Sequence, residues 1–417
     1  MADRDAYPVL SVEEACERIL GYVAPLEAEE VPILQALGRI LAEDVVSDRD
    51  IPPLANSAMD GYAVRFADLA AWPEGEPPRL RIVGEVPAGS IRMQPLGQGE
   101  AVRIMTGAPI PPGADTVVRF EDAAREGEWL IVKRRIAQGR DVRPAGEDVR
   151  AGQVVLMRGT LLRPQEIGML AALGRARVPV MRRPRVAVLS TGDEVAPLGA
   201  PLKPGQIRDS NSYSLAAAVL EAGGVPFVLD VAPDEESALI ARLRQALALP
   251  ADLILTSGGV SAGDFDLTKQ VLAAQGRLDF WWVNMRPGRP MAFGLLGGVP
   301  LLALPGNPVS AMIAFLLFGR PTIRKMLGYR TWELATVQAR LREPITRKDG
   351  RRHYLRVRLY PTIEGWEAEL TGDQGSGILS SMVQADGLAV IPEDCDHLDA
   401  GSLVNVLLFP PPPVLGG

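Results

Sequence analysis

Apolar residues recur at helical spacing in three separate stretches of the chain. The first covers residues 12–23, and here Ser11 and Glu14 stand at the spacing of a capping box. The second covers residues 34–41. The third covers residues 163–174, with a proline suited to the first turn of a helix and a glycine suited to its end. We therefore predict a helix at each of these places.

The pattern between about residues 51 and 149 is that of strands. Short apolar runs such as RLRIVGEVPAG, ADTVVRFED and EWLIVKRRI alternate with proline and glycine. This alternation predicts an all-β segment inserted into a helical one. We expect the helices on either side of the insert to pack together as one discontinuous domain.

From about residue 184 to residue 328, continuous apolar runs alternate with helical patterns. The runs RVAVLSTG, PFVLDVA, ADLILTSGG and PLLALPG are typical of buried strands. Residues 211–222 and 235–249 are typical of helices, as is the segment from Val309. This order predicts a doubly wound parallel sheet with helices on both faces. From about residue 329 short strands return, which predicts a small C-terminal β-domain.

One uncharged run, residues 290–319, is long enough to span a bilayer. Glycine and proline interrupt it repeatedly, so we interpret it as strand, turn, strand, loop and a short buried helix rather than as a membrane span. The predicted fold class is therefore multidomain α/β plus β.

The composition narrows the classes of function. The 417 residues carry 44 Lys and Arg against 51 Asp and Glu, a net charge of −7, which argues against a dedicated nucleic-acid binder. The two cysteines, Cys16 and Cys395, exclude a disulfide framework and a zinc ribbon. The two histidines, His353 and His397, lie outside any nucleophile motif. The N-terminal MADRDAYPVL lacks the apolar core of a signal peptide, so we expect a cytoplasmic protein.

Candidate chemistry gathers where the predicted parallel strands end. Three of these ends carry loops rich in small residues, at 190–194, 256–266 and 304–310. Such ends meet at one edge of an open sheet, and small residues let backbone N–H groups and hydroxyls approach an anion. Each loop alone is also typical of a plain turn, but three together predict a phosphate site, beside which Asn307 can cap the helix opened by Pro308.

Acidic residues lie in the same loops, namely Asp193, Glu194, Asp264 and Asp266. Carboxylates beside a phosphate need a cation between them, and Mg²⁺ commonly binds through one or two carboxylates plus phosphate oxygens. Each acid is equally consistent with a helix cap or a solvated loop. For Asp234 and Glu235, at the start of a predicted helix, capping is favoured.

Arginines in the segment RPGR, Arg286 and Arg289, supply positive charge, and arginine suits bidentate contact with an oxyanion. Exposed turns carry the same residues. In the insert, Asp60 before a glycine indicates a turn by local physics, as do residues 103–107 and 143–148. The residues alone therefore predict a metal-assisted enzyme or binding protein that acts on a small phosphorylated ligand.

Eight motifs occur in a fixed order over nearly the whole chain: NSAMDGYA, RIMTGAPIP, STGDE, GQIRDSNSY, TSGGVSAGDFD, RPGRPMAFG, LPGNPVSA and GDQGSGILSSM. In this order they resemble the molybdopterin molybdenumtransferase family, to which the E domain of gephyrin is equivalent. The resemblance implies four parts: a discontinuous helical linking domain at 1–50 and 150–183, an inserted β-domain at 51–149, an α/β catalytic domain at 184–328 and a barrel-like domain at 329–417.

The resemblance also implies a late step of molybdenum cofactor synthesis. The substrates would be adenylylated molybdopterin and, as co-substrate, molybdate. Mg²⁺ would assist cleavage of the pyrophosphate bond, AMP would leave and molybdenum would enter the dithiolene. A molybdopterin adenylyltransferase would act upstream, and molybdoenzyme apo-proteins would receive the product. An elongated homodimer would form, with each cleft lined by the α/β domain of one protomer and the insert of the other.

Roles carry over to residues at matching motif positions. Asp60 and Thr106 would line the cleft from the insert, and Glu194, Asp234 and Asp266 would form the acidic catalytic set. The metal ligands would be Glu194, Asp264 and Asp266. Substrate would be bound by Arg143, Asp148, Ser190, Thr191, Gly192, Ser257, Gly258, Gly259, Asp264, Arg286, Arg289, Pro305, Gly306, Asn307, Pro308 and Ser376.

The chain departs from the family pattern at a few positions. Its RPGR element has arginine where many relatives have lysine, which keeps the charge. Trp282 stands where some relatives have a further lysine, and Lys269 is a substitute source of that charge. Either Arg351 or Arg352 would match a basic residue of the C-terminal domain.

Two other classes of function stay open. A nucleotide-modifying hydrolase or adenylyltransferase would share the α/β domain, and AMP production from ATP would favour it. A non-catalytic scaffold would resemble gephyrin in its receptor-anchoring role, although the intact acidic loops argue for activity.

Overall fold

The computed structural model of the chain describes residues 8–70, 76–258 and 276–410. It divides into two compact units. Unit 1 comprises Met1–Ala42, Gly159–Leu162 and Val178–Gly417, and unit 2 comprises Glu43–Arg158 and Arg163–Arg177. The four-part division expected above stays a prediction in its boundaries.

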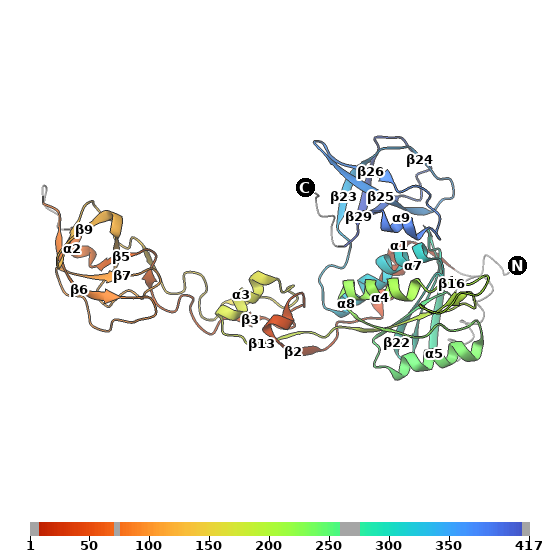
Figure 1. The fold of residues 1–417 in the computed structure, drawn as a ribbon, viewed down its shortest axis with the longest axis horizontal. Helices are drawn as coiled ribbons and strands as arrows, with labels where there is room; N and C mark the ends of the chain where they lie inside the picture. The colour runs from red at the N-terminus through yellow and green to blue at the C-terminus, as the bar shows by residue number, and fades with distance from the viewer. Residues whose placement is uncertain (1–7, 71–75, 259–275, 411–417) are drawn as a thin grey trace. The chain divides into compact units, whose positions relative to one another are not determined.

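A seven-stranded sheet forms the centre of unit 1, in the order β1-β19-β21-β22-β18-β14-β17. Its strand β22 is labelled in Figure 1. Its strands are β1 (Val9–Leu10), β14 (Arg185–Ser190), β17 (Val225–Val228), β18 (Leu253–Ser257), β19 (Gly276–Val283), β21 (Pro290–Leu296) and β22 (Val299–Leu304). The strands β17, β14, β18 and β22 are parallel, as predicted. β21 runs antiparallel to both of its neighbours, because two glycines with positive φ, Gly297 and Gly298, make a tight hairpin to β22.

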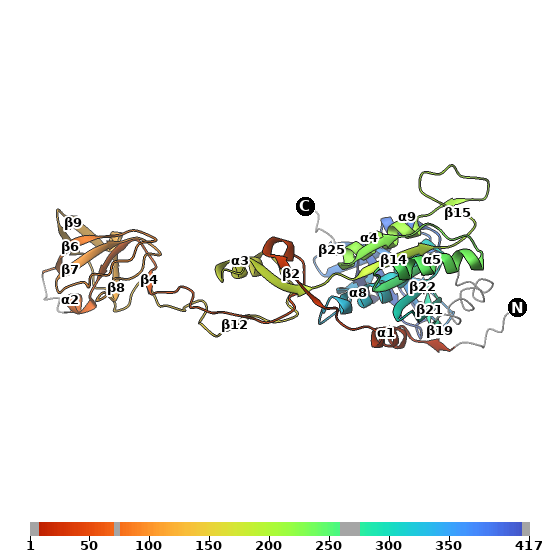
Figure 2. The ribbon, with the colours of Figure 1, turned by 90° about the horizontal axis from the view of Figure 1, so that it is seen from below.

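Helices cover both faces of this sheet (Figure 2). Leu253 and Leu255 of β18 pack with α4 (Asn211–Ala222), α7 (Pro308–Ala314) and α8 (Arg320–Met326). Ile254, between them, packs on the other face with α5 (Glu236–Ala248). Successive residues of a strand point to opposite faces, so an uninterrupted apolar strand is buried on both sides. The prediction of a doubly wound α/β domain is confirmed.

The N-terminal prediction is correct for the first helix and wrong for the second. α1 (Val12–Gly21) begins with the predicted Ser11–Glu14 capping box. Residues 34–41 form just one 3₁₀ turn, η1 (Ile33–Ala36). Gly38 has a φ of 74°, Leu34 is 78% exposed, and the chain beyond pairs with other segments instead of burying one helical face.

The helices that flank the insert lie in different compact units, and the expected discontinuous domain stays a prediction. α1 buries its apolar side in the core that includes α8 and β14 of unit 1. α3 (Pro164–Ala172) belongs to unit 2 and ends near Gly174 with a φ of 71°. The buried apolar residues of α1 belong to the same apolar cluster as those of the central sheet.

Unit 2 contains a six-stranded sheet in the order β8-β5-β7-β6-β10-β9. Its strands are β5 (Gly61–Val64), β6 (Arg79–Val86), β7 (Glu100–Ile104), β8 (Thr116–Arg119), β9 (Ala123–Glu126) and β10 (Trp129–Val132). One apolar cluster includes Tyr62 and Val64, and a second includes Ala63. The prediction of an inserted β segment is confirmed.

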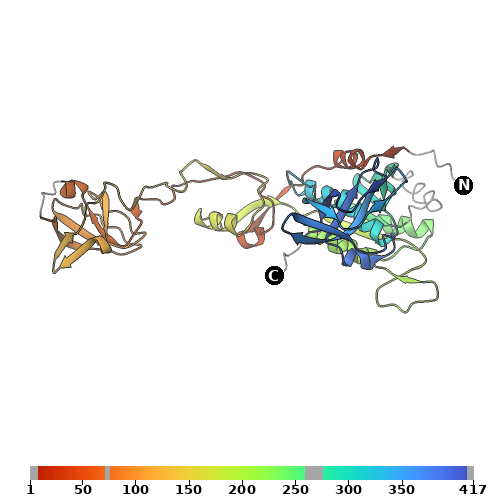
Figure 3. The same ribbon diagram turned by 90° about the horizontal axis from the view of Figure 1, so that it is seen from above.

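The C-terminal part of unit 1, blue in Figure 3, forms a second sheet. This sheet has six strands. Its order is β20-β25-β26-β23-β29-β27, and a further pairing of β25 with β27 closes it into a barrel. The strands are β20 (Met285–Arg286), β23 (Thr336–Leu341), β25 (Arg352–Thr362), β26 (Gly365–Leu370), β27 (Gly387–Ile391) and β29 (Leu403–Leu408). β20 follows β19 of the central sheet, so this pairing joins the barrel to the α/β domain.

The uncharged run 290–319 forms β21, β22, α7 and the π-helical turn η3 (Phe315–Gly319), as the glycine and proline positions predicted. Among the helices of residues 8–70, 76–258 and 276–410, none is long and apolar enough to cross a membrane.

Candidate functional site

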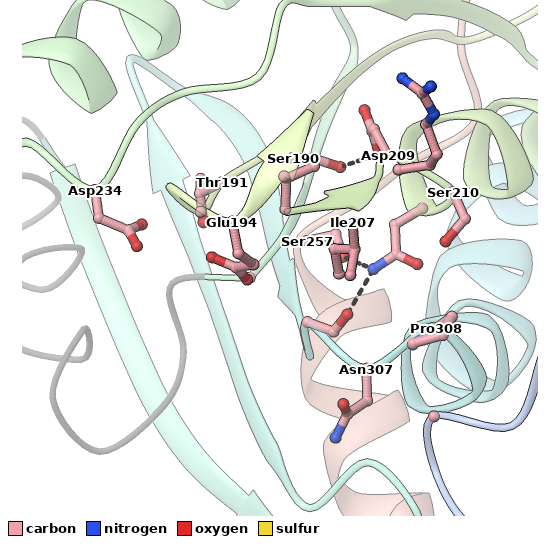
Figure 4. A pocket seen from close by; sticks show the side chains of 17 residues that line it. Ser190, Thr191, Glu194, Ile207, Asp209, Ser210, Asp234, Ser257, Asn307 and Pro308 are labelled. Atoms are coloured by element: carbon pink, nitrogen blue, oxygen red, sulfur yellow. Dashed lines mark hydrogen bonds between the residues drawn. The ribbon is translucent and has the colours of Figure 1, made fainter. Parts of the chain in front are cut away.

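A cavity of about 510 Å³ opens at the carboxyl ends of β14, β18 and β22 (Figure 4). Its walls contain many of the predicted site residues, from the three small-residue loops and from the loop after β17: Ser190, Thr191, Gly192, Glu194, Asp234, Ser257, Gly258, Gly306, Asn307 and Pro308. The topology brings these loops together because parallel strands end at the same edge of the sheet. Gly259, Asp264, Asp266 and Lys269 lie outside the described residues.

Asn211, the first residue of α4, joins two of the loops. Its side-chain Nδ2 donates to Ser257 Oγ at 2.7 Å and to the Gly306 carbonyl at 2.7 Å. Ser257 Oγ in turn donates to the Pro305 carbonyl at 3.1 Å. Pro305 therefore supports the wall from behind, and Asn211 is a site residue that local pattern reasoning missed. Its motif, GQIRDSNSY, was the available signal.

Asp209 holds the third loop in place. It is 6% exposed, and its Oδ1 accepts hydrogen bonds from Ser190 Oγ and from the Ser212 N–H, both at 3.0 Å. Ser190 Oγ also lies 2.8 Å from Ser212 Oγ. A buried carboxylate with this many donors is rigid, so the end of β14 is fixed against the start of α4.

Glycine at position 258 is required by a close approach of two loops. Gly258 has a φ of 95°, and a Cβ there would lie 2.8 Å from the Thr191 carbonyl oxygen. The Thr191 hydroxyl is buried and finds no hydrogen-bond partner among the residues that the structure describes. A buried hydroxyl in a cavity wall is a donor for a ligand, because burial without a partner is costly.

Two carboxylates, of Glu194 and Asp234, face the cavity (Figure 4). Asp234 Oδ2 accepts a hydrogen bond from the Asp193 N–H at 3.4 Å, and the Asp234 N–H donates to Asp193 Oδ1 at 3.1 Å. The favoured interpretation of Asp234 and Glu235 as capping residues is wrong: α5 has Glu235 at its N-cap, without a side-chain capping bond. Asp234 instead joins the loops after β14 and β17.

The donor set fits Mg²⁺, which the family resemblance implies. Mg²⁺ binds through one or two carboxylates, completed by water and substrate phosphate oxygens, and Glu194 and Asp234 supply two carboxylates. Within the described ranges no three Asp, Glu, His or Cys side chains gather to form a ready-made metal cage. The arrangement therefore suits a cation that arrives with a phosphorylated ligand.

A loop from the barrel closes one side of the cavity. Asn307 Nδ2 donates to Ser376 Oγ at 3.0 Å, and the Val309 N–H donates to the Ser376 carbonyl at 3.1 Å. Asn307 stands at the N-cap of α7 as predicted, but its side chain makes no capping bond there. Gly377 lines the cavity beside it. Ser376 is thus brought to the site through Asn307.

A second cavity, of about 420 Å³, is lined by β20, β25 and the loop 372–375 of the barrel, and it is rich in arginine. Arg286 and Arg347 line it together with Arg356, and the loop 372–375 forms another wall. Arg286 lines this second cavity and is not among the residues that line the first, and its role in binding substrate stays a prediction. The two cavities have different charge, and the segment 372–377 contributes to both.

Arg356 was missed by the sequence reasoning. Its side chain is fully buried; Nε donates to Ser381 Oγ at 2.9 Å, and Nη2 donates to the carbonyls of Gly375 at 3.0 Å and Asp373 at 3.3 Å. Burial lowers the pKa of Arg356 from its usual value. Nη1 has no hydrogen-bond partner in the described part of the chain. An arginine between the apolar residues Leu355 and Val357 was the available signal.

Arg289 lines neither of these two cavities. Its guanidinium lies 4.8 Å from the centre of the Trp282 ring, a favourable cation–π contact. Arg286 and Arg289 therefore have different surroundings, although only two residues separate them in the chain.

Comparisons with known proteins agree along nearly the whole chain. Residues 10–174 match the MoeA N-terminal region (domain I and II), residues 187–325 match a probable molybdopterin binding domain, and residues 338–409 match the MoeA C-terminal region (domain IV). "Molybdopterin molybdenumtransferase 2" of Mycobacterium tuberculosis is 39% identical over 90% of this chain and 94% of its own length. The chain belongs to the molybdopterin molybdenumtransferase family.

Further relatives support membership of the molybdopterin molybdenumtransferase family. The molybdopterin molybdenumtransferase of Nostoc is 38% identical, over 97% of this chain and 94% of its own length. The crystal structure of a molybdopterin biosynthesis MoeA protein from Pyrococcus horikoshii is 36% identical and superposes with a TM-score of 0.85. It covers 96% of this chain and 99% of that one.

The molybdopterin molybdenumtransferase motifs of the insert lie in unit 2. Asp60 Oδ1 accepts hydrogen bonds from the N–H and the hydroxyl of Thr106, both at 2.7 Å, and these bonds lower the pKa of Asp60. Arg143 lies in β11 (Val142–Arg143), paired with β4 (Asn56–Ser57). Asp148 is exposed. Asp60 and Thr106 are thus in direct contact, and their place in a substrate cleft stays a prediction.

The two candidate arginines of the C-terminal part have different partners. Arg352 forms ion pairs with Glu13 and, at 3.0 Å, with Glu393. Arg351 instead pairs with Asp349 at 2.6 Å, and Asp349 also pairs with Arg286 at 3.0 Å. Of the two, Arg351 is therefore the one connected to the arginine-rich cavity.

Proposed function

We propose that the chain inserts molybdenum from molybdate into adenylylated molybdopterin, with Mg²⁺-assisted cleavage of the pyrophosphate bond and release of AMP. Membership of the family supports a transferase of molybdenum cofactor biosynthesis. The observation that carries the finer proposal is a cavity lined by Glu194, Asp234 and Thr191, whose buried hydroxyl has no hydrogen-bond partner among the described residues.

In this mechanism the loops bind the pyrophosphate group. The Thr191 hydroxyl and the backbone N–H groups near Gly258 and Gly306 lie in the cavity wall, where small residues allow close approach. Asn211 fixes two of these loops relative to each other. Preorganised donors of this kind stabilise charge that develops on phosphate oxygens during cleavage.

Glu194 and Asp234 are the described residues that would hold Mg²⁺, which neutralises charge on the pyrophosphate. Water attacks phosphorus, the phosphoanhydride P–O bond breaks, AMP leaves, and a carboxylate of this set accepts the proton of the water. A covalent nucleophile is not needed for this step, and the described residues that line the cavity include neither cysteine nor histidine.

The arginine-rich cavity is the proposed place for molybdate. Arg286, Arg347 and Arg356 converge on it, and guanidinium groups suit tetrahedral oxyanions because they donate several hydrogen bonds in a fixed plane. The segment 372–377 contributes to both cavities. The metal donor is thereby kept close to the place where the phosphorylated ligand is cleaved.

The proposal includes a homodimer in the cytoplasm. Asp60 and Thr106 of one protomer would complete the cleft of the other, as the family resemblance implies. A molybdopterin adenylyltransferase must supply the substrate, and apo-molybdoenzymes must accept the product. Sedimentation analysis of the purified protein tests the dimer, and a monomer at micromolar concentration contradicts it.

The central test is incubation with adenylylated molybdopterin, Mg²⁺ and molybdate, followed by assays for AMP and for active cofactor passed to an apo-enzyme. We expect both products from the native chain and neither from Glu194→Gln or Asp234→Asn. Asp230→Asn is the matched control, since that acid pairs with Arg242 outside the cavity. Folded native protein that makes neither product overturns the proposal, and AMP formed from ATP alone favours an adenylyltransferase.

A further inference from the structure

The carboxylate of Asp349 receives three side-chain donors. Arg286 Nη1 donates to Oδ2 at 3.0 Å, and Arg351 Nη2 donates to the same oxygen at 2.6 Å. His353 Nε2 lies 2.7 Å from Oδ1. Arg286 and His353 both line the arginine-rich cavity, so Asp349 connects two residues of that cavity to Arg351.

Asp349 lies in a short connection before β25 that contacts both the barrel and the segment after β19 of the α/β domain. The Asn284 side chain donates from Nδ2 to the Gly350 carbonyl at 3.1 Å. In the parallel pairing of β20 with β25, Arg286 stands opposite His353. His353 therefore holds the carboxylate itself, while Asn284, which follows β19, holds the backbone of the next residue.

The charges around Asp349 leave the positive charge of Arg286 available for binding an anion. His353 is 2% exposed, and burial lowers the pKa of His353 despite the nearby carboxylate, so the ring is neutral at pH 7 and its Nε2–H is the donor to Asp349. Burial opposes ionisation of Asp349, but hydrogen bonds from His353 and Arg286 hold the pKa of Asp349 well below its usual range. Arg351 then balances the carboxylate, which leaves one net positive charge on Arg286.

We propose that Asp349 is a positioning residue, which fixes the Arg286 guanidinium at the arginine-rich cavity so that it binds the tetrahedral oxyanion co-substrate. The proposal rests on the proposed function, in which that oxyanion is molybdate. The side chain of Arg286 is 58% exposed, and a long exposed arginine loses conformational freedom when it binds an anion. Asp349 removes that cost beforehand by holding one edge of the guanidinium.

Positioning and simple charge effects predict opposite results when the carboxylate is neutralised. Coulomb's law alone says that removal of a negative charge near an anion site tightens anion binding. Loss of positioning weakens it. The sign of the change in molybdate affinity therefore separates the two roles.

The experiment uses the full chain and direct calorimetric binding of molybdate, together with steady-state kinetics. For Asp349→Asn we expect molybdate to bind about tenfold more weakly and its KM to rise by a similar factor, while the KM for adenylylated molybdopterin stays unchanged. Asp349→Glu should recover part of the affinity. Glu367→Gln is the control, because it breaks an ion pair with Arg342 elsewhere on the barrel and should leave molybdate binding as in the native chain.

A second variant keeps the test valid if Asp349→Asn does not fold. Arg351→Gln leaves Asp349 bound to Arg286 but removes its balancing charge, so molybdate should again bind more weakly, and more so at low salt. Native-like or tighter molybdate binding by folded Asp349→Asn or Arg351→Gln overturns the inference, as does a native chain that binds no molybdate. If native protein binds molybdate and Asp349→Asn weakens it, but no AMP forms, the proposed function fails while the positioning role stands.

Discussion

Gly258 shows how a single residue type sets the shape of the phosphate-type cavity. Its φ of 95° belongs to the left-handed region, and the Thr191 backbone lies against the space where a side chain would begin. Side chains other than glycine are strained there by conformation and by contact together.

Gly258→Ala should therefore lower both stability and activity. We expect a loss of about 2–3 kcal/mol in the free energy of unfolding, from the left-handed backbone and the clash with Thr191 together, with AMP release reduced at least tenfold. Urea denaturation and the AMP assay measure these effects. Gly298→Ala is the matched control: its φ is 85°, but nothing lies within 4 Å of the added Cβ. Equal losses in the two variants would show that the clash has no effect.

Arg356 has hydrogen-bond partners that lie far from it in the sequence. Its guanidinium reaches a serine side chain and two carbonyls of the loop 372–377. Lysine, a point charge on a flexible stem, cannot satisfy these acceptors together.

Arg356→Lys should loosen that loop. We expect a loss of about 1–3 kcal/mol in the free energy of unfolding, because buried acceptors lose their donors, and weaker molybdate binding. Calorimetric melting and molybdate titration measure both. Arg358→Lys, on the same strand but exposed, with one bond to the Gln384 carbonyl at 3.1 Å, should behave as the native chain does. A native-like Arg356→Lys would contradict the structural role of the guanidinium.

Helix α3 is an element whose stability depends on one carboxylate. Glu166 accepts a hydrogen bond from the Arg163 N–H at 2.9 Å and forms an ion pair with the Arg163 guanidinium at 2.6 Å. The hydrogen bond from Arg163 lowers the pKa of Glu166 to about 2. The ionised form therefore stabilises the folded state.

Glu166→Gln should destabilise unit 2 in a pH-dependent way. The lowered pKa means that the contribution is complete above the unfolded value of about 4.3 and is lost as pH falls towards 2. We expect a deficit of about 1 kcal/mol at pH 7, typical of a lost cap, and a smaller one at pH 3. Denaturation curves at both pH values measure it. A deficit that is the same at pH 3 and pH 7 would exclude the carboxylate charge as its cause.

Local patterns predicted those elements whose ends are fixed locally. α4 has the predicted bounds because Gly223, with a φ of 99°, ends it. The helix predicted at residues 34–41 is absent, because helical spacing of apolar residues does not by itself bury one face of a helix. Asn307 was placed at a helix start, but its hydrogen bond goes to Ser376, 69 residues further along the chain. Such tertiary partners, like those of Arg356, are not encoded in nearby spacing.

At the scale of the whole molecule, the ends of the insert meet. The Ile51 N–H donates to the Val149 carbonyl at 2.7 Å. Between them lie a six-stranded sheet and its own apolar clusters on both faces. A segment with adjacent ends and its own core has what an independent domain requires.

A polypeptide of residues 50–150 should therefore fold by itself. The rest of the chain, with two glycines in place of the insert, should still fold into the α/β domain and the barrel. Because the arginine-rich cavity lies wholly within unit 1, we expect this shortened chain to bind molybdate with native affinity. AMP release should fall at least a hundredfold, because the proposed function assigns Asp60 and Thr106 to the cleft. Heteronuclear NMR of the isolated insert, molybdate calorimetry and the AMP assay test these three expectations. Native rates of AMP release without the insert would show that the α/β domain and the barrel suffice for cleavage.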